Sequence, residues 1–347
     1  YRDNWGVPHI YGKTDVDAAY GLAYAHAEDD LDNIQQALLA ARGKSASVFG
    51  QDHAPNDYMV NLFEIWPKVN KFYDSQISEQ TKAICKGYTD GINQYILDNP
   101  KEALFSVYPV SEKDIIAGFV HKTPLFFGVH KVLEQMIEKK PNEFRKSYKV
   151  DQIEKSVNDA KYTKGSNVFA VAPSRSEDDK VRLAINSHQP WDGQFAWYEA
   201  HINSEEGWNM VGGLFPGSPV VLVGHNDHLG WGHTVNDPDL IDVYELELHA
   251  KDPYLYKFDN EWKRFKVKNI PIEVRLFNLF NWTFYKEALW SVHGPVLKGK
   301  HATYAIRFSN YDNIEMVEQW YKMNKATNFS EWKAAMEMIS VPMFNSG

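Results

Sequence analysis

The sequence predicts an α+β fold in which β-sheets are sandwiched between helices. Residues 1 to about 140 show mostly helical periodicity, whereas from residue 166 onward short alternating segments follow one another with Gly, Pro, Asn and Asp turns between them. A helix-rich half that feeds a sheet-rich half is typical of mixed layers. At 347 residues the chain is long enough to bury a large core, so we expect two closely packed segments.

The first half starts with a strand-like segment, YRDNWGVPHIYG, and then becomes helical. Thr14 is placed to cap a helix that Gly43 ends. Hydrophobic periodicity predicts further helices over residues 57–73, 77–98 and 111–138.

A charge-rich stretch, residues 139–165, has few large apolar side chains. This composition predicts a linker or an excisable spacer, and a solvated helix pair is the alternative. The chain therefore divides into a mainly helical segment, residues 1–138, the spacer, and a β-rich segment, residues 166–347. Because the chain opens in a strand-like segment without an initiator Met, we also expect a trimmed N-terminus.

The β-rich segment starts in the run KGSNVFAVAPSRS, which contains Gly165 and Ser166. Apolar side chains fall on both faces of this run, which predicts a strand inside a layered core. A charged turn leads to a second strand, VRLAINS, so the two should form a hairpin. More strands are expected in the segments YEAHINS, WNMVGGLF, VVLVGH, LGWGHTV and DVYELEL.

Composition excludes several classes of protein. With 37 Lys and Arg against 46 Asp and Glu, the net charge of -9 disfavours a nucleic-acid partner, since phosphate binding needs a positive surface. The apolar runs are shorter than the roughly 20 residues of a membrane span. Hydrophobic residues make up 44% of the chain, which indicates an ordered globular protein. The single cysteine, Cys85, rules out an intrachain disulfide and is expected in the core.

Gly165 and Ser166 could undergo a reaction that an ordinary turn does not. If the bond between them is cut, Ser166 carries both a hydroxyl nucleophile and an α-amine whose pKa is about 7.7 to 8.0, so one residue supplies nucleophile and general base. Gly165 can adopt backbone conformations that other residues resist, which would leave its carbonyl open to attack. The alternative is that Gly-Ser is a turn before a strand, and these two residues alone leave both readings open.

Four ordered blocks resemble the penicillin acylase family of N-terminal nucleophile hydrolases. They are RDNWGVPHIYGKTDVDAAYGLAYAHAEDDL, GSNVFAVAPSRS, PGSPVVLVGHNDHLGWGHTVND and the HGPVL segment from His293. The resemblance implies a four-layer αββα fold in which a helical A chain packs on a β-rich B chain, both cut from one precursor. Family members continue well beyond the region of Asn345, so the resemblance also implies that this chain is part of a longer precursor.

The resemblance implies a role for each catalytic position. Ser166 would be the nucleophile, freed by autoproteolysis after Gly165. His188 would orient the Ser166 amine or assist self-cleavage. The backbone N–H of Val235 and the side-chain amide of Asn345 would stabilise the oxyanion.

The implied activity is hydrolysis of the amide bond of N-acyl compounds through an acyl-enzyme, with acyl-homoserine lactones, penicillins or lipopeptide side chains as small-molecule substrates. Such an enzyme would be periplasmic or secreted and would degrade an antibiotic or a quorum signal. The acyl pocket would use Gln189, Val223 and Phe126 or Phe127. Gln189 and Val223 stand where penicillin-cleaving relatives place aromatic residues, which leaves long aliphatic acyl chains open. The alternative is a non-catalytic binding or scaffold protein that has kept the fold.

The resemblance further implies a structural calcium ion held by Asp239, Asp242 and the carbonyl of Ile241, with Glu134 as a remote candidate ligand. Calcium needs six to eight oxygens, which these positions supply only in part. The alternative is that the two aspartates are exposed turn residues.

Two other sites find little support in the sequence. His225, His228 and His233 form an H-x2-H-x4-H pattern that could suggest zinc, but this spacing matches none of the strong zinc motifs. The run from Gly217 to Pro219 does not complete the G-x-S-x-G elbow of a Ser-His-Asp esterase.

Overall fold

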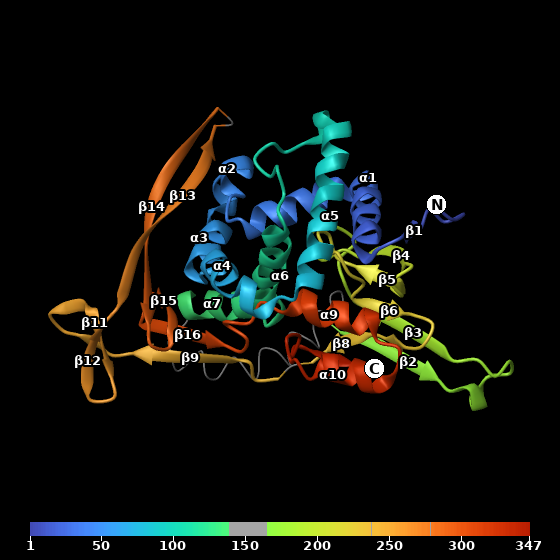
Figure 1. Cartoon of the computed structure of the whole chain (residues 1–347). Coiled ribbons are helices and arrows are strands. Elements are labelled where there is room, and N and C mark those ends of the chain that lie inside the picture. Colours follow the sequence, from blue (N-terminus) through green and yellow to red (C-terminus); the bar gives the residue numbers. More distant parts are fainter. Residues whose placement is uncertain (139–164, 237, 278) are drawn as a thin grey trace.

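A computed structural model of the chain describes residues 1–138, 165–236, 238–277 and 279–347. Helices of the first segment form the centre of the molecule, and strands of the second segment lie around them (Figure 1). The predicted α+β class is confirmed. All of the predicted spacer except Gly165 lies outside the described residues, so the two boundaries of the spacer stay predictions.

The helices of the first segment are α1 (Asp15–Ala41), α2 (Ala46–Phe49), α3 (Ala54–Leu62), α4 (Ile65–Gln76), α5 (Glu79–Asp98), α6 (Glu112–Phe126) and α7 (Val129–Glu138). Those of the second segment are α9 (Met316–Lys325) and α10 (Phe329–Met336). The first strands are β1 (His9–Gly12), β2 (Ser166–Val171), β3 (Arg182–Ser187), β4 (Tyr198–Ser204), β5 (Asn209–Leu214), β6 (Val223–His225), β7 (Gly230–Trp231), β8 (His233–Val235) and β9 (Ile241–Leu246). The later strands are β10 (Leu248–His249), β11 (Asp252–Phe258), β12 (Glu261–Arg264), β13 (Lys266–Leu276), β14 (Phe280–Ser291), β15 (Gly294–Lys298), β16 (Thr303–Phe308) and β17 (Phe344–Ser346).

The capping signals of the first long helix are confirmed. The Thr14 side chain accepts a hydrogen bond from the Asp17 backbone, and the Asp17 side chain accepts one from the Thr14 backbone, which completes a capping box. Gly43 follows the helix with a φ of +64°, a conformation that glycine adopts without strain.

Two of the helices predicted as continuous are broken. The helix expected over residues 57–73 is divided between α3 and α4 at Glu64, whose φ is +51°. The helix expected over residues 111–138 is divided between α6 and α7 at Gly128, whose φ is +78°. In both cases the hydrophobic period continues across a left-handed residue, so the pattern predicts the helices but not the break.

The strands of the described residues are distributed over five sheets. One sheet has the order β1-β4-β5-β6-β7, and it joins the two segments because β1 pairs in parallel with β4. A second has the order β13-β14-β15-β16-β9, and a third contains β10, β11 and β12. The pairs β2-β3 and β8-β17 each form a two-stranded sheet, and these two small sheets carry the predicted site.

The β2–β3 hairpin forms as predicted, but β2 is not buried on both faces. Phe169 and Val171 are 64% and 38% exposed, and on the other face Ser166 and Val168 are half-buried while Ala170 is exposed. The expectation of a strand inside a layered core was wrong for the described residues. The hairpin has no sheet neighbour beyond its two strands, and only one of its faces packs on other described elements.

A buried carboxylate connects the two segments. Asp15, in the first turn of α1, accepts hydrogen bonds from Ser204 of β4, from Tyr321 of α9 and, at 2.8 Å, from the Lys325 ammonium. Burial alone would raise the pKa of Asp15, but these three partners outweigh it and hold the pKa below its usual range.

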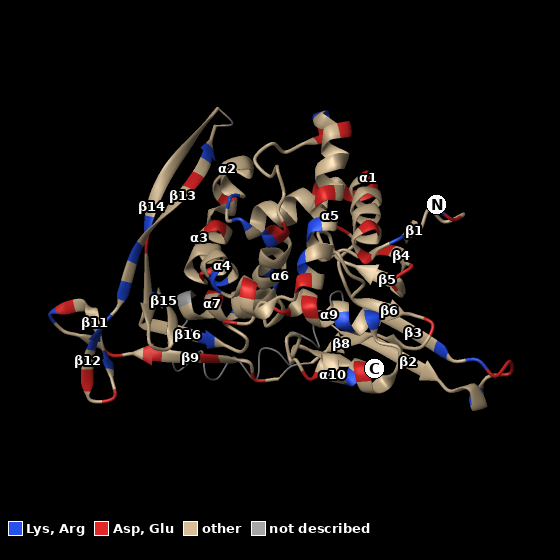
Figure 2. Cartoon of the chain, in the orientation of Figure 1, with Lys and Arg blue, Asp and Glu red and all other residues tan. Residues whose placement is uncertain are grey.

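Charged residues of both signs are interspersed over the described elements (Figure 2). Among the described residues, no helix is both long enough and apolar enough to span a membrane.

The Asp15 contacts predict a large loss of stability on substitution. Asp15→Asn should lower the free energy of unfolding by about 2 to 4 kcal/mol, because it removes a charge-assisted network and leaves buried partners unsatisfied. Asp90→Asn, which breaks the exposed pair with Lys86, should change it by less than about 1 kcal/mol. Both values come from urea unfolding monitored by circular dichroism.

The pH dependence supplies a second readout. A lowered folded pKa means that the contribution of Asp15 is complete above its unfolded pKa near 3.9 and is lost as the pH falls below that value. Below about pH 4, wild type should therefore lose stability more steeply than Asp15→Asn. Parallel stability curves for the two proteins would show that Asp15 makes no such contribution.

Candidate functional site

Ser166 opens β2 and directly follows the predicted cleavage position. Its Oγ donates a hydrogen bond to the carbonyl oxygen of Gly165 at 2.7 Å. The same carbonyl accepts the backbone N–H of His188 at 3.3 Å, across the β2–β3 ladder. The hydroxyl therefore lies beside the carbonyl group that it would attack, and a second donor polarises that group.

Gly165 does not need the conformational freedom that the sequence suggested. Its φ lies outside the left-handed region. A Cβ added there would lie 3.5 Å from His188 Nδ1, an ordinary packing distance. Gly165 therefore makes no use of this freedom in the described chain, and what the position provides is a carbonyl in contact with Ser166 and His188.

His188 follows β3 immediately and is exposed. Its ring Nε2 lies 3.4 Å from the Asn186 amide nitrogen. The antiparallel register that pairs Ser166 with Ser187 places His188 next to the Gly165–Ser166 bond. The structure thus brings the predicted histidine to the predicted cleavage position.

The two predicted oxyanion residues also come together. β8 and β17 pair so that Val235 lies opposite Phe344 and Thr234 opposite Asn345. The Asn345 side-chain amide donates to the carbonyl oxygen of Val235 at 3.2 Å. Both residues are exposed on this short ladder, so a ligand could reach them.

Glycines on β7 and next to β8 leave room for the β2–β3 hairpin. A Cβ added at Gly232 would lie 2.7 Å from Val168 Cγ2 and 2.9 Å from Ile185 Cγ2, closer than packed carbon atoms approach. A Cβ at Gly230 would lie 2.8 Å from Leu183 Cδ2. Leu183 and Ile185, two residues apart on β3, therefore pack against Gly230 and Gly232, which are also two residues apart.

If this pairing of β3 with the β7–β8 segment is extended by two residues, Ser166 lies beside the oxyanion residues. Two positions beyond Ile185 on β3 is Ser187, and two positions beyond Gly232 is Thr234. Ser187 pairs with Ser166, and Thr234 pairs with Asn345. Strands from distant parts of the sequence thus place the predicted nucleophile and both predicted oxyanion residues in one region.

Of the four predicted acyl-pocket residues, Phe126 packs beside a neighbour of the oxyanion residues. Its ring contacts Phe344, the neighbour of Asn345, with centroids 5.3 Å apart, and it also contacts Phe195 and Phe215. Phe127 instead contacts Phe308 of β16.

The other two acyl-pocket residues belong to the second segment. Val223 is buried in β6, and Gln189 is half-buried just after β3. The grouping of these two residues with Phe126 and Phe127 in one acyl pocket stays a prediction.

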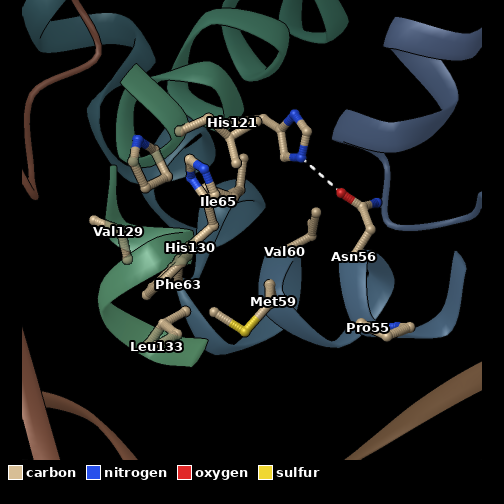
Figure 3. Close-up of a pocket in the computed structure, with 12 residues that line it drawn as sticks. Pro55, Asn56, Met59, Val60, Phe63, Ile65, His121, Val129, His130 and Leu133 are labelled. Carbon is tan, nitrogen blue, oxygen red and sulfur yellow. Dashed lines mark hydrogen bonds between the residues drawn. The ribbon is translucent and has the colours of Figure 1, made fainter. Parts of the chain in front are cut away.

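A separate cavity of about 220 Å³ lies between α3, α6 and α7 (Figure 3). One polar contact in its wall is a 2.8 Å hydrogen bond between His121 Nε2 and Asn56 Oδ1. Burial and the adjacent Lys122 charge lower the pKa of His121 to about 3, so the ring is neutral. The cavity wall is mostly apolar and consists of Pro55, Asn56, Met59, Val60, Phe63, Ile65, His121, Pro124, Leu125, Val129, His130 and Leu133. It contains none of the predicted catalytic or acyl-pocket residues.

Among the described residues, no group of three or more His, Cys, Asp or Glu side chains could hold a metal ion. Asp239 and Asp242 are exposed, and Asp242 lies opposite Arg307 in the β9–β16 ladder. Glu134 is exposed on α7. With the Ile241 carbonyl, two carboxylates fall short of the six to eight oxygens that calcium takes. These three positions alone do not complete a calcium site, and the ion stays a prediction.

The structure also disfavours zinc. His225 and His228 are exposed, whereas His233 is buried and both of its ring nitrogens are occupied. His233 Nε2 accepts from Trp320 Nε1 at 3.0 Å, and His233 Nδ1 bonds to Ser346 Oγ at 2.9 Å. Burial lowers the pKa of His233 to about 4, against a hydrogen bond with the backbone of Asn345 that raises it.

Sequence reasoning missed this contact set around the oxyanion residues. His233 entered the sequence analysis as a doubtful zinc ligand, and Ser346 and Trp320 did not enter it. The only available signal was their position: His233 and Ser346 lie within two residues of Val235 and Asn345. Trp320 lies on α9, a helix that the sequence analysis did not predict.

The chain is similar to known proteins over nearly its whole length. The model of the family described as penicillin amidase matches residues 1–346. An acyl-homoserine lactone acylase PvdQ of Pseudomonas fluorescens is 25% identical over 99% of this chain and 48% of its own length. The aculeacin-A acylase of Actinoplanes utahensis is 21% identical over 97% of this chain and 46% of its own length. The chain thus spans about half the length of the curated relatives it matches.

Among solved structures, a thermostable penicillin G acylase from Alcaligenes faecalis in an orthorhombic crystal form aligns over 48% of this chain and 30% of its own. The sequence identity is 24% and the TM-score is 0.40, a similarity too weak to define the fold.

The packing around Gly232 predicts that even one methyl group there displaces the hairpin. Gly232→Ala should lower the free energy of unfolding by about 1 to 3 kcal/mol, because the β-branched Val168 and Ile185 side chains are stiff. It should also accelerate hydrogen exchange of the β2 amides, measured by mass spectrometry. Gly118→Ala in α6, where a Cβ meets nothing within 4 Å, is the control and should leave β2 exchange unchanged. Equal β2 exchange in wild type and Gly232→Ala would contradict the proposed packing.

Proposed function

The chain belongs to the penicillin amidase family, and from this premise we propose that it is a self-processing N-terminal serine amidohydrolase. Its substrates are N-acyl compounds such as acyl-homoserine lactones, penicillins or lipopeptides, and it cleaves their amide bond through an acyl-enzyme. The observation that carries the proposal is the convergence of Ser166, Val235 and Asn345 on neighbouring strands.

Self-processing starts with Ser166 Oγ, which attacks the carbonyl carbon of Gly165. The peptide C–N bond breaks, the hydroxyl proton passes to the Ser166 nitrogen, and an ester joins Gly165 to Ser166 Oγ. Water then hydrolyses the ester, which leaves a carboxylate on Gly165 and a free α-amine on Ser166. The 2.7 Å contact between Oγ and the carbonyl oxygen and the N–H donor from His188 both support this step.

Substrate hydrolysis reuses the same serine. The Ser166 amine takes the proton while Oγ attacks the substrate carbonyl, and the negative charge on oxygen is stabilised by the Val235 N–H and the Asn345 amide. Collapse releases the amine product and leaves an acyl-enzyme, which water cleaves by the same route. In this mechanism the Asn345 amide turns from the Val235 carbonyl, its partner in the described chain, to the developing oxyanion.

We further propose that the acyl group lies against Phe126. This side chain comes from the last part of α6 and packs on Phe344, next to Asn345. Gln189 and Val223 offer no aromatic wall, so aliphatic acyl chains are favoured over phenylacetyl groups.

The remaining parts of the proposal are coarser. The four-layer αββα architecture, two chains from one precursor, a periplasmic or secreted location and a structural calcium ion are what family membership suggests. Calcium takes no part in the chemistry above. A rise in melting temperature on adding calcium, lost in Asp239→Asn, would test for the ion.

The test of self-processing is the intact mass of the full-length expressed protein. Wild type should appear as two chains, one starting at Ser166, whose masses sum to that of the precursor plus one water. Ser166→Ala should stay one chain. Ser176→Ala, on the turn of the same hairpin, is the matched control and should be cleaved like wild type. A wild type that stays uncleaved would support the alternative of a non-catalytic binding or scaffold protein.

The oxyanion assignment predicts a defect in substrate turnover that is separate from any defect in self-processing. In the cleaved enzyme, Asn345→Ala should lower kcat for an N-acyl substrate by about 10²- to 10³-fold with little change in KM, since the amide acts on charge that develops in the transition state. Asn281→Ala, on the separate sheet of β14, should keep wild-type kcat. A loss confined to KM would make Asn345 a binding residue instead.

A further inference from the structure

His233 lies on β8, two residues before Val235, and it is hydrogen-bonded at both ring nitrogens to residues of two other elements. We propose that His233 is a positioning residue that fixes β17 against β8 and so sets the separation of the Val235 and Asn345 oxyanion donors. Its side-chain partners are Trp320 of α9 and Ser346 of β17. This inference rests on the proposed function and adds to it the device that holds the oxyanion donors in place.

The direction of each hydrogen bond follows from the chemistry of the groups. An indole N–H can only donate, so His233 Nε2 must accept from Trp320. In a neutral ring the proton then resides on Nδ1, which donates to Ser346 Oγ. The His233 ring therefore has one defined tautomer. We call the chain of hydrogen bonds from Trp320 through His233 to Ser346 the relay.

The location of the relay gives it control over the register. The β8–β17 ladder contains only three residue pairs, and a short isolated pair of strands is marginal by itself. His233 lies directly opposite Ser346, and the next pair along the ladder is Thr234 with Asn345. A shift of one residue would turn the Asn345 side chain to the other face and would break the His233–Ser346 bond as well.

The ring is also held by packing on its sides. It stacks on Phe344 with centroids 5.1 Å apart and an angle of 18° between the planes. Phe344 in turn contacts Phe126. The imidazole is therefore fixed through its faces as well as through its nitrogens, and the residues that flank Asn345 supply contacts of both kinds.

Trp320, the first donor of the relay, lies on α9, and this helix is held by contacts outside the candidate site. Asn324, one helical turn beyond Trp320 on α9, exchanges hydrogen bonds with both the N–H and the carbonyl of Val221. Tyr321 and Lys325 of the same helix bind Asp15 of α1. Because α9 is fixed to both segments of the chain, Trp320 presents its N–H from a rigid support.

Rigid support matters for oxyanion donors because they work by preorganisation. A displacement of about 1 Å in such a group can cost about 10²-fold in rate. Since the donors act on charge that is absent from the ground state, a loosened ladder should reduce kcat and leave KM nearly unchanged.

The test compares four single variants and the Ser346→Ala, Trp320→Phe double variant of the full-length protein. Ser346→Ala removes the acceptor of the relay, and Trp320→Phe removes the donor while keeping an aromatic ring. Ser346→Thr keeps the hydroxyl and is the rescue variant. Trp332→Phe is the matched control, because the Trp332 Nε1 has no hydrogen-bond partner among the described residues.

We expect Ser346→Ala and Trp320→Phe each to lower kcat for an N-acyl substrate about 10- to 100-fold, with KM within about threefold of wild type. The double variant should lose little more than the worse single variant, since both act through one ring. Ser346→Thr should recover most of the activity, and Trp332→Phe should match wild type. Wild-type kcat in Ser346→Ala and Trp320→Phe would overturn the inference, as would additive losses.

Hydrogen exchange separates this inference from the proposed function and needs no turnover. The amides of Asn236 and Gly347 bond across the ladder to Met343 and Gly232, and they should exchange at least tenfold faster in Ser346→Ala and Trp320→Phe than in wild type. Equal exchange in all proteins overturns the positioning role even if the enzyme is active. If wild type hydrolyses no N-acyl substrate, the proposed function fails while a change in exchange still shows that the relay fixes the ladder.

Discussion

The pairing of β8 with β17 is the constraint on which the rest of the site depends. It joins segments that are about a hundred residues apart and sets Asn345 beside Val235. The β2–β3 hairpin is placed by packing on Gly232, which lies just before β8, and so the position of Ser166 follows from the same ladder. If this short ladder shifts, the position of the nucleophile relative to the oxyanion donors changes.

The helical segment supports that ladder from a distance. Asp15 at the start of α1 binds α9, and α9 carries the indole that donates to His233. At the other end of the segment, Phe126 of α6 packs on Phe344 of β17. The helices therefore contribute support and a wall, while the strands of the second segment carry the groups assigned to chemistry.

The sequence predicted the parts that depend on local chemistry. Thr14 and Gly43 mark the ends of α1 because capping and left-handed backbone are local properties. The breaks at Glu64 and Gly128 and the open face of β2 escaped prediction, since periodicity does not report backbone strain or which neighbour covers a strand. The catalytic positions were predicted from the resemblance to a known family. The registers of the β2–β3 and β8–β17 pairs then showed which of them lie near one another. The His233 relay could not be predicted, because its partners meet only in the folded chain and Trp320 lies 87 residues away.

The central claim is that Ser166, once its amine is free, is the residue that becomes acylated. The most direct measurement is the mass of the peptide that starts at Ser166, after the cleaved enzyme has reacted with an activated aliphatic ester and has been quenched in acid. The account predicts that this peptide gains one acyl group on its Ser166 hydroxyl and that the group is lost on longer incubation in buffer. An acyl group on another residue, or none in an enzyme that still turns over the ester, would contradict it.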